Sequence, residues 1–128
     1  MSNQPMILVA EPEEVVRESI QITLIEEGYD CHAVCDTVSL LRAIRIHNSN
    51  LIIADVRIIY DKIHEILDTQ NHYSTVPPFL VVLSYEQVGT MPNLMKLGIT
   101  EYLIKPFSFE ELLERIQKTI IPKPNIPI

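Results

Sequence analysis

The sequence predicts an α/β domain in which helices cover a parallel β-sheet. Short apolar runs alternate along the chain with segments whose apolar residues repeat at the spacing of a helix. This alternation is typical of a layered domain, because each helix returns the chain to the edge where the next parallel strand begins. The chain has 128 residues, and 47% of them are apolar. Such a length and composition suit one compact domain with a sizeable core.

Five segments are expected to form strands. Four are strongly apolar and are followed by, or end on, a polar residue. The second along the chain is more mixed: it contains Cys31 and is followed by Cys35. Runs of this length and composition are typical of strands. The expected strands are residues 6–10, about 30–34, 51–54, 79–83 and 102–104.

The first two expected helices follow the first and second strands. The first spans residues 13–27, because its apolar residues repeat every four positions on one face, and Gly28 is suited to end it. The second spans about residues 38–47. Either Thr37 or Ser39 is expected to cap its N-terminus, because a hydroxyl there can accept a bond from a free backbone N–H.

The next two helices are expected to be weaker or shorter. One covers about residues 60–70, where apolar residues recur with less regularity. The other covers about residues 92–97. Gly89 and Pro92 are expected to delay its start and Gly98 to end it.

The last expected helix begins at Ser108, where the order Ser-Phe-Glu-Glu fits a capping box with Glu111 reaching back. Residues 121–128 then contain three prolines and cannot continue a helix. We therefore expect one domain over residues 1–121 and a proline-rich tail, or the start of a linker, over residues 122–128. A further domain beyond this tail is left open.

The charge and hydropathy of the chain exclude some function classes. The formal net charge is -7, which argues against nucleic acid as a direct partner, because phosphate binding needs a basic face. No apolar run approaches the roughly 20 residues of a membrane span. The N-terminal residues lack the basic start of a signal peptide. The expectation is a cytoplasmic protein whose partners are other proteins, or small anions held at a local positive charge such as Lys105.

Cys31 and Cys35 are the only cysteines, and in the cytosol they are expected to be free thiols. The run Cys-His-Ala-Val-Cys could be interpreted as a metal cluster. In a strand, however, the two cysteines face one side and His32 faces the other, and further zinc ligands are not obvious nearby. An ordinary strand is therefore the favoured interpretation.

Each of four expected strands is followed by a polar residue, and the four residues differ in type. These residues are Glu11, Asp55, Ser84 and Lys105. In an open parallel sheet, ligands and chemistry lie just beyond the carboxyl ends of the strands. Two acids, a hydroxyl and an amine that converge there can bind a metal ion and a phosphoryl group.

These residues resemble the response-regulator receiver domain of two-component signalling over about residues 6–120. The matching parts are Ile-Leu-Val-Ala-Glu at residues 7–11, then Asp55, Ser84 and, most specifically, Tyr-Leu-Ile-Lys-Pro-Phe at residues 102–107. The resemblance implies a flavodoxin-like, doubly wound (βα)5 fold, whose five-stranded parallel sheet has the strand order 2-1-3-4-5.

The resemblance also implies a role for each of these residues. Asp55 would accept a phosphoryl group from a histidine kinase or phosphotransfer protein, and Lys105 would help Mg²⁺ to neutralise the charge of that group. Ser84 would bond a phosphoryl oxygen, and Tyr102 would turn inward when Ser84 moves. The peptide bond between Lys105 and Pro106 would be cis. Taken alone, Asp55 could be a solvated acid or a helix cap, but with Lys105 and Ser84 in register a phosphoacceptor is favoured.

The expected metal site departs from the family pattern. The resemblance gives Glu11, Asp55 and the backbone carbonyl of Arg57 as the Mg²⁺ ligands. In the family a second acid follows the first, whereas here Glu11 is followed by Pro12. Loss of that carboxylate predicts weak Mg²⁺ binding. Pro12 suits the start of a helix, and whether Glu11 or Glu13 reaches in to compensate is left open.

The loop after Asp55 departs as well. Residues 56–62 lack the proline and glycine that are common there in the family. This loop instead carries Arg57, two residues past the aspartate. We therefore hypothesise that the cationic side chain of Arg57 partly replaces a weak metal ion, or contacts the phosphoryl group itself.

The leading functional hypothesis is a phosphoaccepting receiver that is not an enzyme beyond its own phosphorylation and dephosphorylation. Phosphorylation would change a surface, formed by the fourth helix, the fifth strand and the fifth helix, that binds a downstream effector protein or domain. The alternative is a pseudo-receiver, a docking or dimerisation module that works without phosphorylation. A flavin- or nucleotide-binding enzyme is disfavoured, because a phosphate cradle needs glycines after the first strand and none is there. The kinase, the output and a homodimer are left open.

Overall fold

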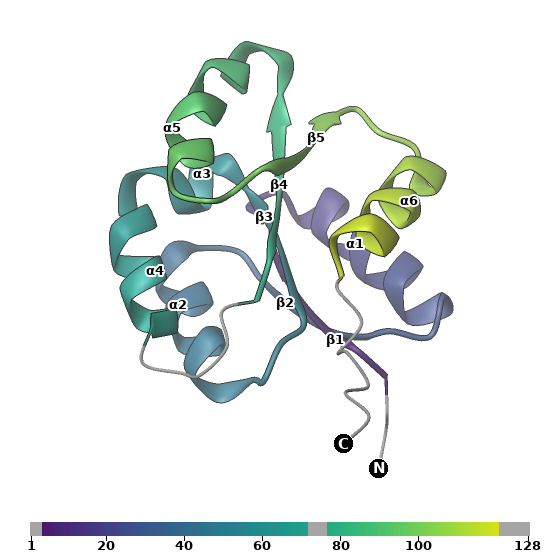
Figure 1. Ribbon diagram of the computed structural model, residues 1–128. Helices are drawn as coiled ribbons and strands as arrows, with labels where there is room; N and C mark the ends of the chain where they lie inside the picture. Colours follow the sequence, from purple (N-terminus) through teal and green to yellow (C-terminus); the bar gives the residue numbers. More distant parts are fainter. Residues whose placement is uncertain (1–3, 72–76, 121–128) are drawn as a thin grey trace, which may run out of the picture.

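A computed structural model describes residues 4–71 and 77–120 of the chain. Its centre is a five-stranded parallel sheet in the order β2-β1-β3-β4-β5 (Figure 1). Both the fold class and the strand order expected from the sequence are confirmed. The residues expected to form a proline-rich tail lie outside the described part.

The strands begin close to where the sequence predicts, and three of them extend further. The polar residues at the ends of the third, fourth and fifth runs are the last residues of their strands, rather than the first residues after them. Each therefore has its backbone fixed by the sheet, which holds its side chain at the carboxyl edge. The strands are β1 Met6–Ala10, β2 Asp30–Val34, β3 Leu51–Asp55, β4 Phe79–Ser84 and β5 Glu101–Lys105.

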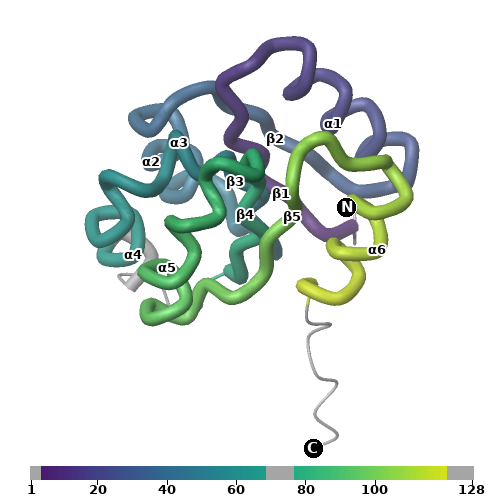
Figure 2. Tube along the Cα trace, turned by 90° about the horizontal axis from the view of Figure 1, so that it is seen from above, coloured from purple at the N-terminus to yellow at the C-terminus, as the bar shows by residue number. Residues whose placement is uncertain are grey.

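Helices cover both faces of the sheet. In Figure 2, which is seen from above, α1 and α6 lie on one side of the sheet and α2, α3, α4 and α5 on the other. The α-helices are α1 Glu14–Glu26, α2 Thr37–Ile46, α3 Val56–Ile59, α4 Ile63–Asn71, α5 Met91–Lys96 and α6 Phe109–Thr119. Two 3₁₀ segments, η1 Tyr60–Lys62 and η2 Tyr85–Thr90, lie directly before α4 and α5.

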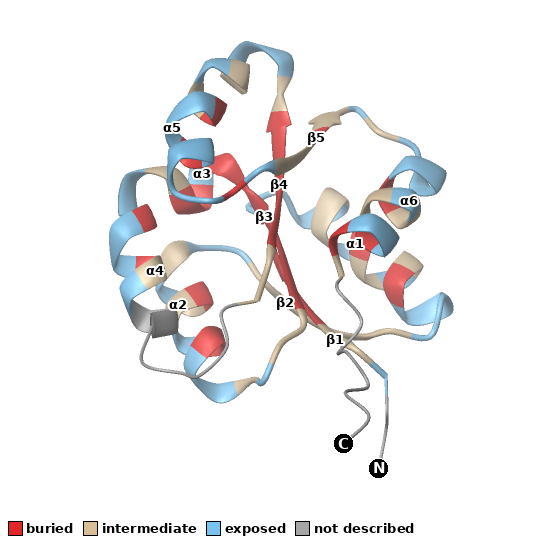
Figure 3. Ribbon diagram, viewed as in Figure 1, coloured by how far each residue is buried: buried red, intermediate tan, exposed pale blue. Residues whose placement is uncertain are grey.

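The strand residues divide into two apolar layers, because successive side chains in a strand point to opposite faces. On β3, for example, Ile53 packs in the layer under α1 and α6, while Ile52 packs in the layer under the other helices. The central strands are consequently buried on both sides (Figure 3). A sheet buried in this way holds its carboxyl edge rigidly, and that edge carries the expected site.

The same alternation explains the cysteine segment. Cys31 and Ala33 pack in the layer under α1 and α6, and Val34 packs in the opposite layer. Burial raises the pKa of the Cys31 thiol to about 11. Both cysteines are free thiols. The segment is strand β2, as the sequence predicts.

The start of α2 differs from the prediction. The capping residue is Asp36, whose Oδ1 accepts a 2.8 Å hydrogen bond from the backbone N–H of Ser39, so the expectation of Thr37 or Ser39 was wrong. Asp is among the strongest N-cap residues, because its carboxylate accepts from an N–H of the first turn and carries the charge that the helix N-terminus favours.

Two further helical segments begin earlier than predicted. Helical structure follows Asp55 at once, because its carboxylate accepts from the backbone N–H of Arg57 and caps α3. A 3₁₀ segment follows Ser84 at once, because the backbone N–H of Ser84 donates to Oε1 of Gln87 at 2.9 Å. Gly89 therefore lies inside the 3₁₀ segment. The prediction that Gly89 delays the start of helical structure was wrong.

The cap of α6 was predicted correctly. The backbone N–H of Glu111 donates to Oγ of Ser108 at 3.1 Å. The Glu111 carboxylate reaches back as expected, but it accepts from the Ser108 hydroxyl at 3.3 Å. Both contacts hold the first turn of α6 directly after the strand that carries Lys105.

Gly98 ends α5 in a left-handed conformation, with φ of 92°. We expect Gly98→Ala to lower the free energy of unfolding by about 1–2 kcal/mol, because a Cβ is unfavourable at this φ. Urea unfolding measures the effect. Gly89→Ala is the matched control, since Gly89 has no positive φ and an added Cβ meets open space. A loss no larger for Gly98→Ala than for the control would contradict this explanation of the helix end.

Within residues 4–71 and 77–120, no helix is both long enough and apolar enough to cross a bilayer.

Candidate functional site

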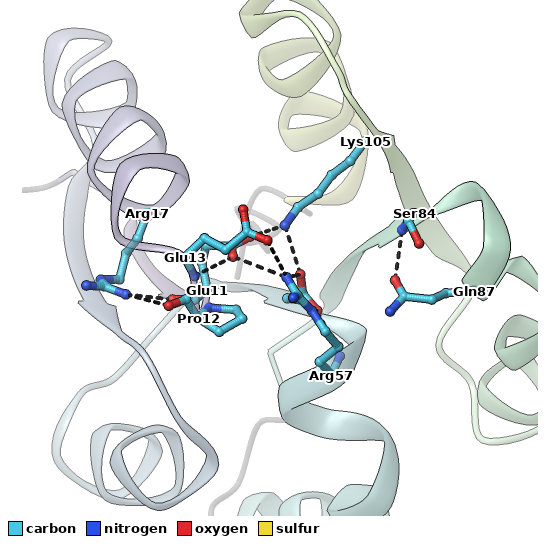
Figure 4. A network of polar contacts seen from close by, with 9 residues as sticks. Glu11, Pro12, Glu13, Arg17, Arg57, Ser84, Gln87 and Lys105 are labelled. Carbon is cyan, nitrogen blue, oxygen red and sulfur yellow. Dashed lines mark hydrogen bonds and ion pairs between the residues drawn. The ribbon is translucent and has the colours of Figure 1, made fainter.

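The carboxyl edge of the sheet brings two buried acids and a lysine together (Figure 4). Glu11 follows β1, Asp55 ends β3, and Lys105 ends β5. Lys105 Nζ lies 2.6 Å from Glu11 Oε1 and 2.9 Å from Asp55 Oδ2. The two carboxyl side chains are only 2% and 1% exposed. Charges buried to this degree need partners, and Lys105 is a cation that contacts both acids.

Arg57 makes a second set of contacts with Asp55. Its Nε donates to Oδ1 at 2.9 Å and its Nη2 donates to Oδ2 at 2.8 Å. Its backbone N–H also donates to Oδ1, at 2.8 Å. A guanidinium that binds both oxygens of a carboxylate is a strong and directional pairing. Arg57 reaches this position because the cap at Asp55 turns the chain directly into α3.

The residues around Pro12 determine where the neighbouring acids point. Oε2 of Glu11 accepts from the backbone N–H of Glu13 at 2.9 Å. Arg17, one turn into α1, donates to the carbonyl oxygen of Glu11 at 2.9 Å. Glu13 is exposed and contacts Nη2 of Arg57 at 3.2 Å. The Glu11 side chain thus lies inside the site, whereas the Glu13 side chain contacts Arg57 from the solvent side.

These contacts change the protonation equilibria of the site. Burial alone would raise the pKa of Asp55, but hydrogen bonds from Arg57 and Lys105 hold this pKa below its ordinary value. Burial alone would lower the pKa of Lys105, but hydrogen bonds to Glu11 and Asp55 hold it above its ordinary value. Its bond to Asp55 likewise raises the pKa of Arg57. The folded site therefore favours an ionised aspartate between two cations.

Ser84 lies at the same edge but outside this network. It pairs in register with Lys105 on the neighbouring strand. Among the described residues, no hydrogen bond joins its side chain to Asp55 or Lys105. Glu86 has a lowered pKa, first through its own backbone N–H and second through a bond with the Ser84 side chain. In Figure 4, Ser84 and Gln87 lie at the right, apart from the contacts that join Glu11, Arg57 and Lys105 at the centre.

The two other positions singled out in the sequence lie on or next to β5. Tyr102 is half-buried and packs against the layer under α2 to α5. The peptide bond between Lys105 and Pro106 is cis. The expected switch residues Ser84 and Tyr102 therefore lie on adjacent strands, and Lys105 follows Tyr102 on the same strand.

Two residues of the site region were not expected from the sequence. Gln87 holds the backbone N–H of Ser84, and the order Ser-Tyr-Glu-Gln could have revealed this contact as a capping pattern. Arg17 ties α1 back to the carbonyl of Glu11, and no local signal in the sequence points to that contact. The alternative positions left open for Glu11 and Glu13 are now distinguished, since only the carboxylate of Glu11 is buried.

The donor set does not fit a magnesium ion. Mg²⁺ takes near-octahedral oxygen ligands, usually one or two free carboxylates with waters. Here both oxygens of Asp55 are bonded to Arg57, and the oxygens of Glu11 are taken by Lys105 and by a backbone N–H. Over residues 4–71 and 77–120, no cluster of three or more acidic, His or Cys side chains is arranged to hold a metal ion.

Buried acids and a lysine at the carboxyl edge of an open parallel sheet place this chain among the doubly wound α/β domains whose ligands bind at that edge. Within this class, the family model described as the response regulator receiver domain matches residues 7–117. The chain therefore belongs to the response regulator receiver domain family, and the family resemblance expected from the sequence is confirmed. Receiver domains act in two-component signalling, interact with histidine kinases and effector domains, and typically use Mg²⁺ for phosphorylation.

Curated relatives support the same family. The chain is 30% identical over 111 residues to the transcriptional regulatory protein PcoR of Escherichia coli. It is 28% identical over 117 residues to the probable transcriptional regulator ycf27 of Cyanidium caldarium. These alignments cover 87% and 91% of this chain, but 49% and 47% of the relatives. The chain thus spans about half the length of these curated relatives.

Solved structures support the fold. The chemotaxis protein CheY4 of Vibrio cholerae superposes with a TM-score of 0.78 at 21% identity, over 91% of this chain and 98% of that one. A CheY-like receiver domain protein of Methanospirillum hungatei JF-1 superposes with a TM-score of 0.80 at 20% identity, over 92% and 94%. At these identities the likeness shows the fold alone.

Proposed function

We propose that this domain accepts a phosphoryl group on Asp55 and passes the signal on by changing a protein-binding surface. The observation that carries the proposal is the direct contact between Lys105 Nζ and the buried carboxylate of Asp55, at 2.9 Å. A carboxylate can attack phosphorus, and an ammonium group beside it can stabilise the negative charge of the transferring group. The donor would be a phosphohistidine of a histidine kinase or of a phosphotransfer protein.

The proposed step is a simple exchange of bonds. An oxygen of Asp55 forms a bond to phosphorus while the bond from phosphorus to the imidazole nitrogen breaks. The electron pair of that bond stays on the imidazole, which regains a proton from water. The product is an aspartyl phosphate, whose added charge lies beside Lys105. Since the folded site keeps the pKa of Asp55 low, the attacking carboxylate is ionised at neutral pH.

The proposed response begins at Ser84 and Tyr102. An aspartyl phosphate brings about two negative charges and three acceptor oxygens to the edge of the sheet. The Ser84 hydroxyl, on the strand next to that of Lys105, would bond a phosphoryl oxygen. Tyr102 would then move further into the layer against which it already packs. The surface affected would be that of α5, β5 and α6, and its reader would be a downstream effector protein or domain.

Phosphorylation by a small acyl phosphate tests the proposal. We expect intact-protein mass spectrometry to show a gain of one phosphoryl group in the wild type and no gain in Asp55→Ala. Asp61→Ala is the control, because Asp61 is an exposed aspartate of the adjacent 3₁₀ segment η1. The control is expected to be labelled like the wild type. A wild type that takes up no phosphoryl group, with or without Mg²⁺, would overturn the proposal.

The structure also gives a reason to keep a pseudo-receiver as the second candidate. Arg57 binds both oxygens of Asp55, and the side chain of Ser84 accepts from the backbone N–H of Gln87. A domain locked in this way would dock or dimerise through its surface without phosphorylation. An unlabelled wild type in the acyl phosphate experiment would favour this candidate. In either case we propose a cytoplasmic protein with protein partners and no direct contact with nucleic acid.

A further inference from the structure

We infer that the guanidinium of Arg57 is a built-in cation that takes the place of a divalent metal ion at Asp55 and keeps that ion out. The part of this inference that concerns metal exclusion stands on the described contacts alone. The part that concerns catalysis, that Arg57 supplies charge during phosphoryl transfer, rests on the function proposed above. Both parts follow from where the guanidinium lies and from what surrounds it.

The first argument is occupancy. Arg57 donates three hydrogen bonds to Asp55, two from its side chain and one from its backbone. Both carboxylate oxygens are used, so neither is left as a free ligand for a metal ion. A metal ion would have to break a bidentate pair whose planar geometry matches the carboxylate. A lysine at this position would present a single point of charge and leave one oxygen open.

The second argument is charge. Nη2 of Arg57 lies 2.8 Å from Asp55, 3.2 Å from Glu13 and 3.7 Å from Glu11. Three carboxylates thus lie within 3.7 Å of one guanidinium nitrogen, which supplies a positive charge shared by all three. Pro12, between the two glutamates, contributes no carboxylate. With Lys105 included, two cations face three anions, so the charge that a divalent ion would balance is already largely balanced.

The third argument is mobility. The Arg57 side chain is 44% exposed, whereas Asp55 beneath it is 1% exposed. The guanidinium therefore forms the outer wall of the site and can turn outward without disturbing the apolar layers. An incoming phosphoryl group would accept the hydrogen bonds that the Arg57 guanidinium now donates to Asp55. The positive charge of Arg57 would then lie beside the phosphoryl group instead of the carboxylate. This would make phosphoryl transfer independent of a metal ion.

A titration with Mg²⁺ tests the exclusion directly. Backbone amide signals around Asp55 are followed by NMR in the wild type, in Arg57→Ala and in Arg57→Gln. We expect no saturable shift in the wild type over the Mg²⁺ range used. In both variants we expect saturable binding, with a dissociation constant at least about tenfold below the highest Mg²⁺ concentration that leaves the wild type unsaturated, because the Asp55 carboxylate no longer pairs with a guanidinium. Adding Pro12→Asp to Arg57→Ala should tighten binding again. Wild-type binding as tight as in the variants, or no gain in any of them, would overturn the inference.

The matched control is Arg115→Ala. Arg115 lies on α6, is 43% exposed and pairs with Glu101 of β5 at 3.6 Å, so it resembles Arg57 in exposure and in having an acidic partner. It lies outside the site, and its removal is expected to leave Mg²⁺ binding as in the wild type. The dispersion of the same NMR spectra shows that each variant is folded.

A second measurement separates this inference from the proposed function. The rate of labelling by an acyl phosphate is compared with Mg²⁺ and with a chelator. We expect the wild-type rate to be insensitive to the chelator, and the rate of Arg57→Ala to become dependent on Mg²⁺. If the wild type is labelled only in the presence of Mg²⁺, the inference that Arg57 takes the place of the metal ion is contradicted, whereas the proposed phosphorylation is supported. A wild type that is never labelled would sink the proposed function, and the NMR titration would still decide on metal exclusion.

Discussion

Replacing Lys105 with methionine is expected to lower the free energy of unfolding by about 3 kcal/mol at neutral pH, because it leaves two buried carboxylates without the cation they share. Glu11 loses most, since Lys105 lies 2.6 Å from its Oε1 and no hydrogen bond from the rest of the described chain reaches that oxygen. Methionine keeps the apolar length of the side chain, so the loss reports the charge rather than the packing. Urea unfolding at neutral pH measures the effect.

The effect also has a direction with pH. The pKa of Lys105 is raised above its ordinary value of 10.5, so its stabilisation is complete below that value and is lost as the pH rises through the raised folded pKa. The difference between wild type and Lys105→Met should therefore persist through mildly alkaline pH. Lys118→Met is the control, because Lys118 is 63% exposed and pairs with Glu114 at only 3.7 Å. Equal losses for the two variants would contradict a shared, buried role for Lys105.

Replacing Asp55 with asparagine is expected to lower the free energy of unfolding by roughly 2 kcal/mol at neutral pH, because hydrogen bonds to a charged group are the stronger kind. The folded pKa of Asp55 lies below its ordinary value of 3.8. Its ionised form therefore adds stability that is present above pH 3.8 and is lost as the pH falls through the lower folded pKa. The difference between wild type and Asp55→Asn should shrink as the solution becomes acidic. Urea unfolding over a series of pH values measures this trend.

The exposed Asp61 again provides the comparison. Asp61→Asn is expected to change the free energy of unfolding little at any of these pH values, because Asp61 is solvated in η1. If Asp55→Asn proves more stable than the wild type at neutral pH, repulsion between Asp55 and Glu11 outweighs their attraction to the cations. That result would contradict the favourable balance of charges described here.

Much of the fold could be predicted because most of its strands are short runs of apolar residues. A run such as Leu-Ile-Ile-Ala, apolar at every position, is typical of a strand that is buried on both faces. Helix ends were less predictable, because the groups that decide them lie close together and compete. Asp36, Thr37 and Ser39 are all suitable caps, and only the geometry of the turn shows that Asp36 takes the role. Ser108 had no such rival and was identified correctly.

The site was predictable in its members but not in its contacts. Parallel strands deliver their ends to one edge, so the meeting of Glu11, Asp55 and Lys105 follows from topology alone. The direction of a long side chain does not, because it depends on which turn follows the strand. Arg57 reaches Asp55 because α3 begins at once, whereas the sequence had placed that helix later. The hypothesis that Arg57 acts beside the aspartate could therefore be formed from the sequence, but its bidentate contact could not.

Lys105 also has a consequence for the mechanics of the sheet. It stands on the outermost strand β5, yet its partners belong to β3 and to the residue after β1, so its side chain spans the strand between them. An edge strand is ordinarily the first part of a sheet to fray. Here the end of β5 is tied by electrostatic cross-bracing to the centre of the molecule. Separating β5 from the sheet would break the ion pairs of Lys105 with Glu11 and Asp55. We therefore expect the end of β5 to unfold together with the central strands.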